Sequence, residues 1–170
     1  EGYTVQQILA LLASKGVNTE EALTEAAKTA SFTYDFIKDT GELSRLEGYL
    51  FPDTYEFYLN EKPASAIKRL LDNFNRKMTE ERMQAVEESG YSLKEIITIA
   101  SLIEKETDGT DQTKISSVIH NRMNHPDYET AGFLQIDAAI AYVTGRAVTQ
   151  ADYQDVDSPY NTYLYQGLPP

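Results

Sequence analysis

The segment that decides the fold is Ser-Leu-Lys-Glu-Ile-Ile-Thr-Ile-Ala-Ser-Leu-Ile-Glu-Lys-Glu, residues 92–106. Ser92 and Glu95 form a Ser-x-x-Glu capping box directly before an apolar run, which predicts a helix that begins after Ser92. At about 100° per residue, the apolar side chains share a stripe that we predict to face inward. The members of this stripe are Leu93, Ile96, Ile97, Ala100 and Ile103.

One carboxylate of this helix is predicted to point inward. Glu104 follows Ala100 by four residues and falls inside the stripe, whereas Glu106 lies outside its edge. Burial disfavours the charged form of a carboxylate and raises its pKa, as a general acid working near neutral pH requires. Periodicity leaves a second interpretation open, a structural ion pair with Arg122, which lies on the apolar side of its own helix.

Short helices are predicted on both sides of this segment. Helical periodicity covers residues 4–14, 19–30, 64–78, 80–88 and 112–124, and a short helix follows Asp137. Gly16, Gly90 and Gly145 suit helix C-caps, and Pro126 is expected to stop the helix of 112–124. Residues 43–58 predict a turn that enters a strand or a loop. We therefore predict an α+β fold in which helices dominate.

Composition limits the classes of partner. With 170 residues the chain is long enough for one main domain and a small appendage. A formal net charge of -12 argues against a nucleic-acid partner and against an anionic membrane surface, because both attract basic side chains. Glycan is compatible with this charge, since sugars are bound by hydrogen bonds and by aromatic rings, and the chain has 12 tyrosines.

Metal sites and membrane spans find little support in the sequence. Without cysteine there are no disulfides or thiolate ligands, and His120 and His125 are a weak basis for a metal site, so we predict none. No apolar run is long enough to cross a bilayer, and no signal peptide is visible at Glu1. Because the chain ends at Pro170 with no element being closed, we expect an excerpt of a longer protein.

Four segments occur in an order that points to one enzyme family. They are residues 46–55 (LEGYLFPDTY), residues 100–107 (ASLIEKET), residues 134–137 (LQID), and residues 160–163 with 167–170 (YNTY and GLPP). In order and approximate spacing they resemble the motifs of the MltG/YceG-like endolytic transglycosylases. Two departures are Ile136, where a small hydroxyl residue is usual, and His120, where an apolar residue is commoner.

The resemblance implies a division of the chain and a mechanism. Residues 1–40 resemble the end of the family's small LysM-like region, and residues 41–170 its catalytic domain, truncated at the C-terminus. Glu104 takes the catalytic role. It protonates the glycosidic oxygen between N-acetylmuramic acid and N-acetylglucosamine. It then accepts the proton of the muramic C6 hydroxyl, which attacks C1 and leaves a 1,6-anhydro end.

No cofactor or metal is implied by this mechanism. An ordinary glycosidase uses two carboxylates, whereas this reaction needs one. Two alternatives stay open, a hydrolytic muramidase and a non-catalytic peptidoglycan-binding module.

Other polar residues of the motifs are candidate substrate contacts. Gln135 is predicted to bond an acetamido group or to orient the sugar, with a satisfied loop amide as the alternative. Asp137 either contacts substrate or caps the helix that follows it. Tyr160, Asn161 and Tyr163 suit the faces and edges of sugars, or else form a structural tyrosine cluster.

Four further residues are predicted to support the site. Glu47 lies in a turn motif, where structural hydrogen bonding and substrate contact are equally compatible. For Arg122 we rank a structural salt bridge above the binding of a muramyl carboxylate. Asn121 precedes it in the sequence. Glu106 neighbours the catalytic residue, and His120 is predicted to lie on the exposed arc of its helix.

The resemblance also implies partners and a location. The substrate is the glycan strand of peptidoglycan, and the partners are cell-wall synthases. The location is the extracytoplasmic face of the bacterial cell membrane, where a single-pass anchor absent from this chain would hold the full-length protein. An endolytic enzyme holds sugars on both sides of the cut, so we expect a groove that passes Glu104 in both directions, with Tyr160 and Tyr163 on one wall.

Overall fold

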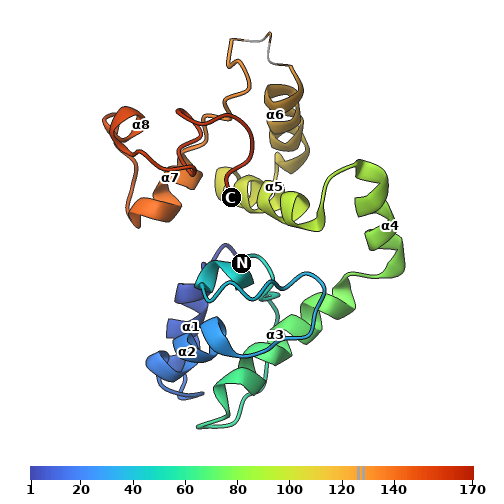
Figure 1. The fold of residues 1–170 in the computed structure, drawn as a ribbon, viewed down its shortest axis with the longest axis vertical. Helices are drawn as coiled ribbons and strands as arrows, with labels where there is room; N and C mark the ends of the chain where they lie inside the picture. The colour runs from blue at the N-terminus through green and yellow to red at the C-terminus, as the bar shows by residue number, and fades with distance from the viewer. Residues whose placement is uncertain (126, 128) are drawn as a thin grey trace. The chain divides into compact units, whose positions relative to one another are not determined.

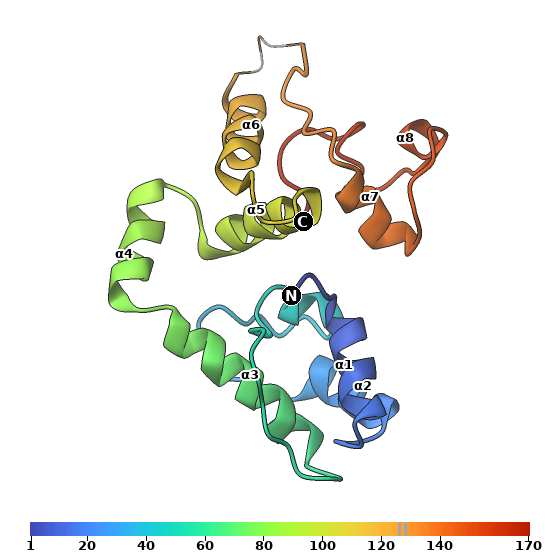
Figure 2. The same cartoon turned by 180° about the vertical axis from the view of Figure 1, so that it is seen from behind.

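The computed structural model describes residues 1–125, 127 and 129–170, which form helices joined by loops (Figures 1 and 2). The chain divides into two compact units, Glu1–Leu93 and Lys94–Pro170. The predicted dominance of helices is confirmed, whereas the described ranges contain no strand that would make the fold α+β. The predicted domain boundary at residues 40 and 41 concerns family regions, and it stays a prediction together with the LysM-like character of residues 1–40.

The first unit is built on three helices that bury apolar faces against one another. Its helices are α1 (Val5–Ser14), α2 (Glu20–Thr29), the 3-10 helix η1 (Leu43–Leu46), α3 (Pro63–Lys77) and α4 (Glu80–Ser89). Leu9 of α1, Leu23 of α2 and Leu71 of α3 are fully buried. Thr4 and Gln7 form a capping box that starts α1, so a local signal fixes the position of this helix.

Residues 43–58 form η1 and an extended loop where the sequence permitted a strand. Side-chain hydrogen bonds tie this segment to its neighbours: both carboxylate oxygens of Glu47 accept the N–H of Val5, the first residue of α1, at 3.1 Å. Further along, the Asp53 carboxylate accepts a hydrogen bond from the Asn73 amide at 3.0 Å, which ties the loop to α3. Among the described residues, this loop has no partner strand.

The second unit contains α5 (Leu93–Glu106), α6 (Gln112–Asn124), α7 (Asp137–Thr144) and the short α8 (Asp152–Asp155). A single apolar cluster joins α5, α6 and α7. Its buried members are Ile99, Leu102, Ile119, Leu134, Ile136 and Ala139. Leu168 packs against this cluster, so the C-terminal segment returns to α5, as both ribbon views show.

Glycines end several helices where the sequence predicts. Gly90 after α4 and Gly145 after α7 both have a left-handed backbone, with φ of 75° and 67°. α6 ends at Asn124 as predicted, whereas the stop attributed to Pro126 lies outside the described residues. Among the residues that the structure describes, no helix has both the length and the apolar character needed to cross a membrane.

Candidate functional site

Helix α5 presents Glu104 on its exposed face. Its buried residues are Ile99 and Leu102, each 4% exposed, and both Ala100 and Glu104 are exposed. The predicted inward stripe is therefore wrong in phase, and Glu104 is not a buried carboxylate. The cause is that apolar residues occur around much of this helix, so packing against α6 and α7 selects the buried side.

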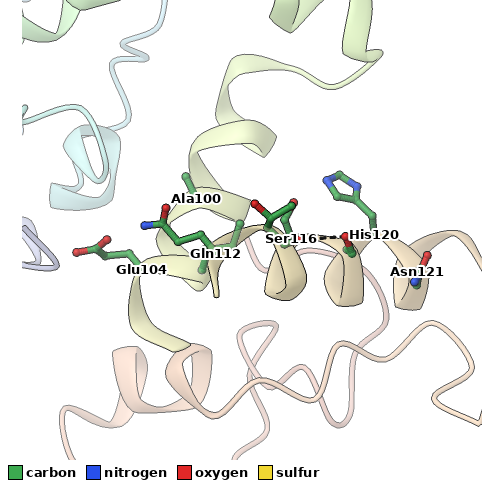
Figure 3. Close-up of a pocket in the computed structure, with 9 residues that line it drawn as sticks. Ala100, Glu104, Gln112, Ser116, His120 and Asn121 are labelled. Carbon is green, nitrogen blue, oxygen red and sulfur yellow. Dashed lines mark hydrogen bonds between the residues drawn. The ribbon is translucent and has the colours of Figure 1, made fainter. Parts of the chain in front are cut away.

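An open pocket of about 670 Å³ lies between α5 and α6, and Glu104 lines it. We call it the α5–α6 pocket. Its lining residues are Ala100, Ile103, Glu104, Gln112, Thr113, Ser116, Ser117, His120 and Asn121. Figure 3 shows Glu104 at one end of a row of side chains that continues along α6. Among the described residues, Glu104 is the one carboxylate that lines this pocket.

The α6 wall of this pocket consists of hydroxyl, amide and imidazole side chains. Most of these residues were not singled out from the sequence, although Thr113, Ser116, Ser117 and His120 recur at helical spacing, a signal that could have found them. His120 is half-buried and lines the pocket, which corrects its predicted place on the exposed arc. The wall can donate and accept hydrogen bonds along one face of a bound polar chain.

Arg122 and Glu104 do not form the ion pair that the sequence left open. The Arg122 guanidinium donates instead to the Leu134 carbonyl, and Glu104 has no hydrogen bond or ion pair to another described residue. Arg122 thereby ties α6 to the segment that precedes α7. Asn121 lines the α5–α6 pocket, and Glu106 is exposed at the end of α5.

The structure brings the central and downstream motifs together. The Thr162 carbonyl accepts the Gln135 N–H at 3.1 Å. The Thr162 hydroxyl accepts the Ile136 N–H at 2.9 Å and donates to the Ile136 carbonyl at 3.2 Å. Gln135 itself is exposed and has a φ of 53°, in the left-handed region that side-chain-bearing residues rarely adopt. Residues 134–136 are thus held rigidly while the Gln135 side chain faces solvent.

Asp137 binds two tyrosines. Its carboxylate accepts hydrogen bonds from the Tyr163 hydroxyl at 2.7 Å and from the Tyr153 hydroxyl at 3.3 Å. The two rings stack with centroids 4.1 Å apart. Burial, and then the bond to Asp137, raise the pKa of Tyr163 above its ordinary value. The predicted helix cap is wrong, because Ile136 occupies the N-cap position and α7 has no side-chain cap.

Asn161 and Tyr160 have unequal access to a ligand. Asn161 is 0% exposed, and its amide donates to three carbonyls, of which that of Val156 is the nearest at 2.9 Å. The side-chain oxygen of Asn161 also accepts the Tyr163 N–H at 3.0 Å. This amide supports the loop from within. Tyr160 is half-buried, and its ring lies against that of Tyr142, with centroids 5.1 Å apart.

The predicted site residues fall into three groups. Glu104 and Asn121 share the α5–α6 pocket. Gln135, Asp137, Asn161 and Tyr163 belong to the joined central and downstream motifs, and none of these four side chains forms a hydrogen bond with Glu104. Glu47 belongs to the first unit, where it binds the start of α1. In the part of the chain that is described, no three acidic or histidine side chains are grouped as a metal site would need.

Comparison with known proteins gives one family. The model of the YceG-like family matches residues 1–170. An endolytic murein transglycosylase of Streptococcus pneumoniae serotype 2 (strain D39 / NCTC 7466) is 32% identical over 198 residues, covering 100% of this chain and 34% of the relative. A protein of the same name from Bacillus subtilis (strain 168) is 35% identical over 128 residues, covering 74% of this chain and 34% of the relative.

A solved structure shows the same fold. The crystal structure of a yceG-like protein from Listeria monocytogenes, lmo1499, superposes with a TM-score of 0.78 at 28% sequence identity. The match covers 99% of this chain and 59% of that chain. The chain spans about a third of the length of the curated relatives it matches.

Proposed function

The chain belongs to the YceG-like family, and from this membership we propose that it is the catalytic part of an endolytic murein transglycosylase with Glu104 as its acid and base. The observation that supports the proposal best is the place of Glu104. Glu104 is exposed and lines an open pocket whose second wall offers hydroxyl and amide groups to a sugar chain.

The proposed reaction uses one carboxyl group twice. Protonated Glu104 donates its proton to the oxygen between N-acetylmuramic acid and N-acetylglucosamine, and the bond from C1 to that oxygen breaks. The resulting carboxylate accepts the proton of the muramic C6 hydroxyl, whose oxygen bonds to C1 and closes the 1,6-anhydro ring. Glu104 ends as it began, protonated. A glycan lying over a carboxyl group removes water from it, and desolvation favours the protonated form.

We propose direct sugar contacts for some residues of the motifs and indirect roles for others. Gln135 and Tyr160 reach the surface and are proposed to bind sugar directly. Asp137, Asn161 and Tyr163 are proposed to act on substrate through the loop that their hydrogen bonds hold. Asn121 is proposed as a further contact in the α5–α6 pocket.

Location and partners follow from the same proposal. Relatives named murein transglycosylases imply a substrate in the cell wall, and we propose an extracytoplasmic protein. A single-pass anchor, cell-wall synthases as partners, and the β elements of an α+β fold are proposed for the whole protein.

The test uses the full-length protein and uncrosslinked peptidoglycan glycan. Glu104→Gln keeps the side chain's shape but cannot carry the proton, so the rate should fall by about 10²–10⁴-fold, as removal of a general acid and base does. Glu106→Gln, two residues along the same helix, is the matched control and should stay within a few-fold of wild type.

Mass spectrometry of the products separates the alternatives. Anhydromuramic ends from the wild type and the Glu106→Gln variant, formed at least about 10²-fold more slowly by a folded Glu104→Gln variant, support the proposal. Reducing ends indicate a muramidase, and glycan binding without any product indicates a binding module. Either of these last two results overturns it.

A further inference from the structure

The segment 134–136 has a backbone conformation that its neighbours impose. Gln135 has a φ of 53°, and a left-handed backbone is unfavourable for a residue with a Cβ unless the surrounding structure enforces it. Glycine adopts this conformation without strain, yet the chain carries a glutamine here. A strained backbone at a residue whose side chain is polar and exposed suggests that this side chain has a functional role.

Hydrogen bonds hold each residue of this segment. Arg122 donates to the Leu134 carbonyl, and the Thr162 carbonyl accepts the Gln135 N–H at 3.1 Å. The Thr162 hydroxyl bonds both the N–H and the carbonyl of Ile136, at 2.9 and 3.2 Å. Thr162 is 1% exposed, so water does not compete with these bonds.

The same segment is anchored to the helices that form the α5–α6 pocket. Leu134 and Ile136, on either side of Gln135, are 0% and 6% exposed and belong to the apolar cluster with Ile99 of α5. The Gln135 backbone therefore cannot turn without disturbing the packing of α5. Its side chain is in consequence presented on the same rigid body as Glu104.

We propose that Gln135 binds the acetamido group of an N-acetyl sugar and that Thr162 is a positioning residue that holds Gln135 in its left-handed conformation. This inference rests on the proposed function for the substrate class. A primary amide both donates and accepts, so it pairs with the carbonyl and the N–H of an acetamido group. Thr162 does not touch the sugar and acts only through Gln135.

Gln135→Gly in the full-length protein separates the side chain from the backbone. Glycine relieves the left-handed strain, so Tm should rise by roughly 2–4 °C. Loss of the amide should weaken glycan binding about tenfold, the effect of one good hydrogen bond. Binding is measured in the Glu104→Gln background, where turnover is expected to be slow. Ala131→Gly is the matched control, since Ala131 also has a positive φ, of 47°, and should raise Tm with glycan affinity unchanged.

The acetamido group is tested by changing the substrate. Peptidoglycan glycan and the same glycan after N-deacetylation are compared for both forms of residue 135. On deacetylation the affinity of wild type should fall about tenfold and that of Gln135→Gly less than about twofold. The reason is that the Gln135 amide and the acetamido group are the two partners of one interaction, which is already absent from Gln135→Gly. An equal loss in both forms, or a lower Tm for Gln135→Gly, overturns the proposal.

Thr162 is tested by the hydroxyl alone. Thr162→Ser keeps the hydroxyl and should bind acetylated glycan as wild type does. Thr162→Val should behave like Gln135→Gly: it should bind acetylated glycan more weakly, and its affinity should no longer fall when the glycan is deacetylated. If Thr162→Val loses affinity on deacetylation as wild type does, the positioning role is overturned. If Thr162→Val does not fold, Thr162→Ser decides: a folded Thr162→Ser variant whose affinity no longer falls on deacetylation also overturns the positioning role. If the wild type binds acetylated glycan selectively but yields no anhydro product, the proposed function fails while the role of Gln135 stands.

Discussion

A residue that donates a proton and later takes one back has to meet its substrate directly. Glu104 satisfies this requirement through exposure, since it lines the α5–α6 pocket and its carboxylate is not engaged by another described side chain. Burial with a counter-ion such as Arg122 would hold the carboxylate charged and out of reach. At the scale of the residue, the exposed position gives a glycan direct access to the carboxyl group, and the bound glycan would supply the desolvation that burial was predicted to supply.

Asn161 illustrates the opposite case, a polar residue whose importance is structural. Asn161→Ala should lower the free energy of unfolding by about 2–4 kcal/mol, because three buried or partly buried carbonyls and the Tyr163 N–H lose their partner. Urea unfolding of the variant measures the loss. Asn121→Ala, an exposed asparagine, is the control and should stay within about 0.5 kcal/mol of wild type. Equal stability of the two variants would show that Asn161 does not brace the loop.

Asp152 makes the stability of the second unit depend on pH. The Arg146 guanidinium, and then the N–H and hydroxyl of Thr149, hold the pKa of this carboxyl well below its usual 3.8. A lowered folded pKa means that the stabilisation is complete above the unfolded pKa of about 3.9 and is lost as the pH falls below it. Urea midpoints between about pH 5 and pH 2 should therefore fall less steeply for Asp152→Asn than for wild type. Asp155→Asn, on the same short helix, should keep the wild-type slope, and identical slopes for all three proteins would contradict this assignment.

At the scale of the element, the orientation of α5 decides which side chains reach the pocket. Leu102→Ala should cost about 2–5 kcal/mol of unfolding free energy, because Leu102 is 4% exposed in the apolar cluster. Ala100→Gln should cost less than about 1 kcal/mol, since Ala100 is exposed. Thermal and urea unfolding of the two variants check this. The reverse order of losses is what the stripe predicted from sequence requires, and it would return Glu104 to the interior.

The sequence predicts where the helices begin and end better than how they are turned. The ends depend on local signals, such as the Thr4 capping box and the left-handed Gly90, which act within a few residues. The orientation of α5 depends on α6 and α7, and an apolar run that extends around the helix does not specify it. The bond between Asp137 and Tyr163 joins residues 26 positions apart, and no local pattern marks it.

The candidate site was predicted in the same uneven way. Resemblance to family motifs singled out Glu104 and Gln135, and the structure gives both an exposed position. The hydroxyl groups of Thr113 and Ser116 were not predicted as part of the site, because their helical spacing alone does not indicate that α6 lines a pocket with Glu104. Thr162, the residue that holds Gln135, lies inside a recognised motif but gave no sign of its partners.

At the scale of the whole molecule, endolytic cleavage requires sugar-binding sites on both sides of the cut. The lining of the α5–α6 pocket runs from Glu104 along α6 as far as Asn121, and the ten residues from Gln112 to Asn121 cover about 14 Å of helix. This wall extends in one direction from Glu104 and is formed by α5 and α6 alone among the described residues, so Tyr160 and Tyr163 are not part of it. The proposed endolytic action therefore needs sugar contacts outside this pocket, either at residues that reach the surface, such as Gln135 and Tyr160, or in other parts of the full-length protein. This chain spans about a third of the length of its curated relatives.

Early products of a long glycan distinguish the two modes of cleavage. If the full-length protein binds sugars on both sides of Glu104, digestion of long, uncrosslinked glycan should yield internal fragments of many lengths from the first minutes. Size-exclusion chromatography with mass spectrometry follows the fall in mean strand length, and Glu104→Gln serves as the blank. An enzyme with binding sites on one side alone releases disaccharides from the strand end while the mean length falls slowly. That second pattern would leave Glu104 its acid and base role and refute endolytic action, because a strand held on one side of the carboxyl group is cut only near its end.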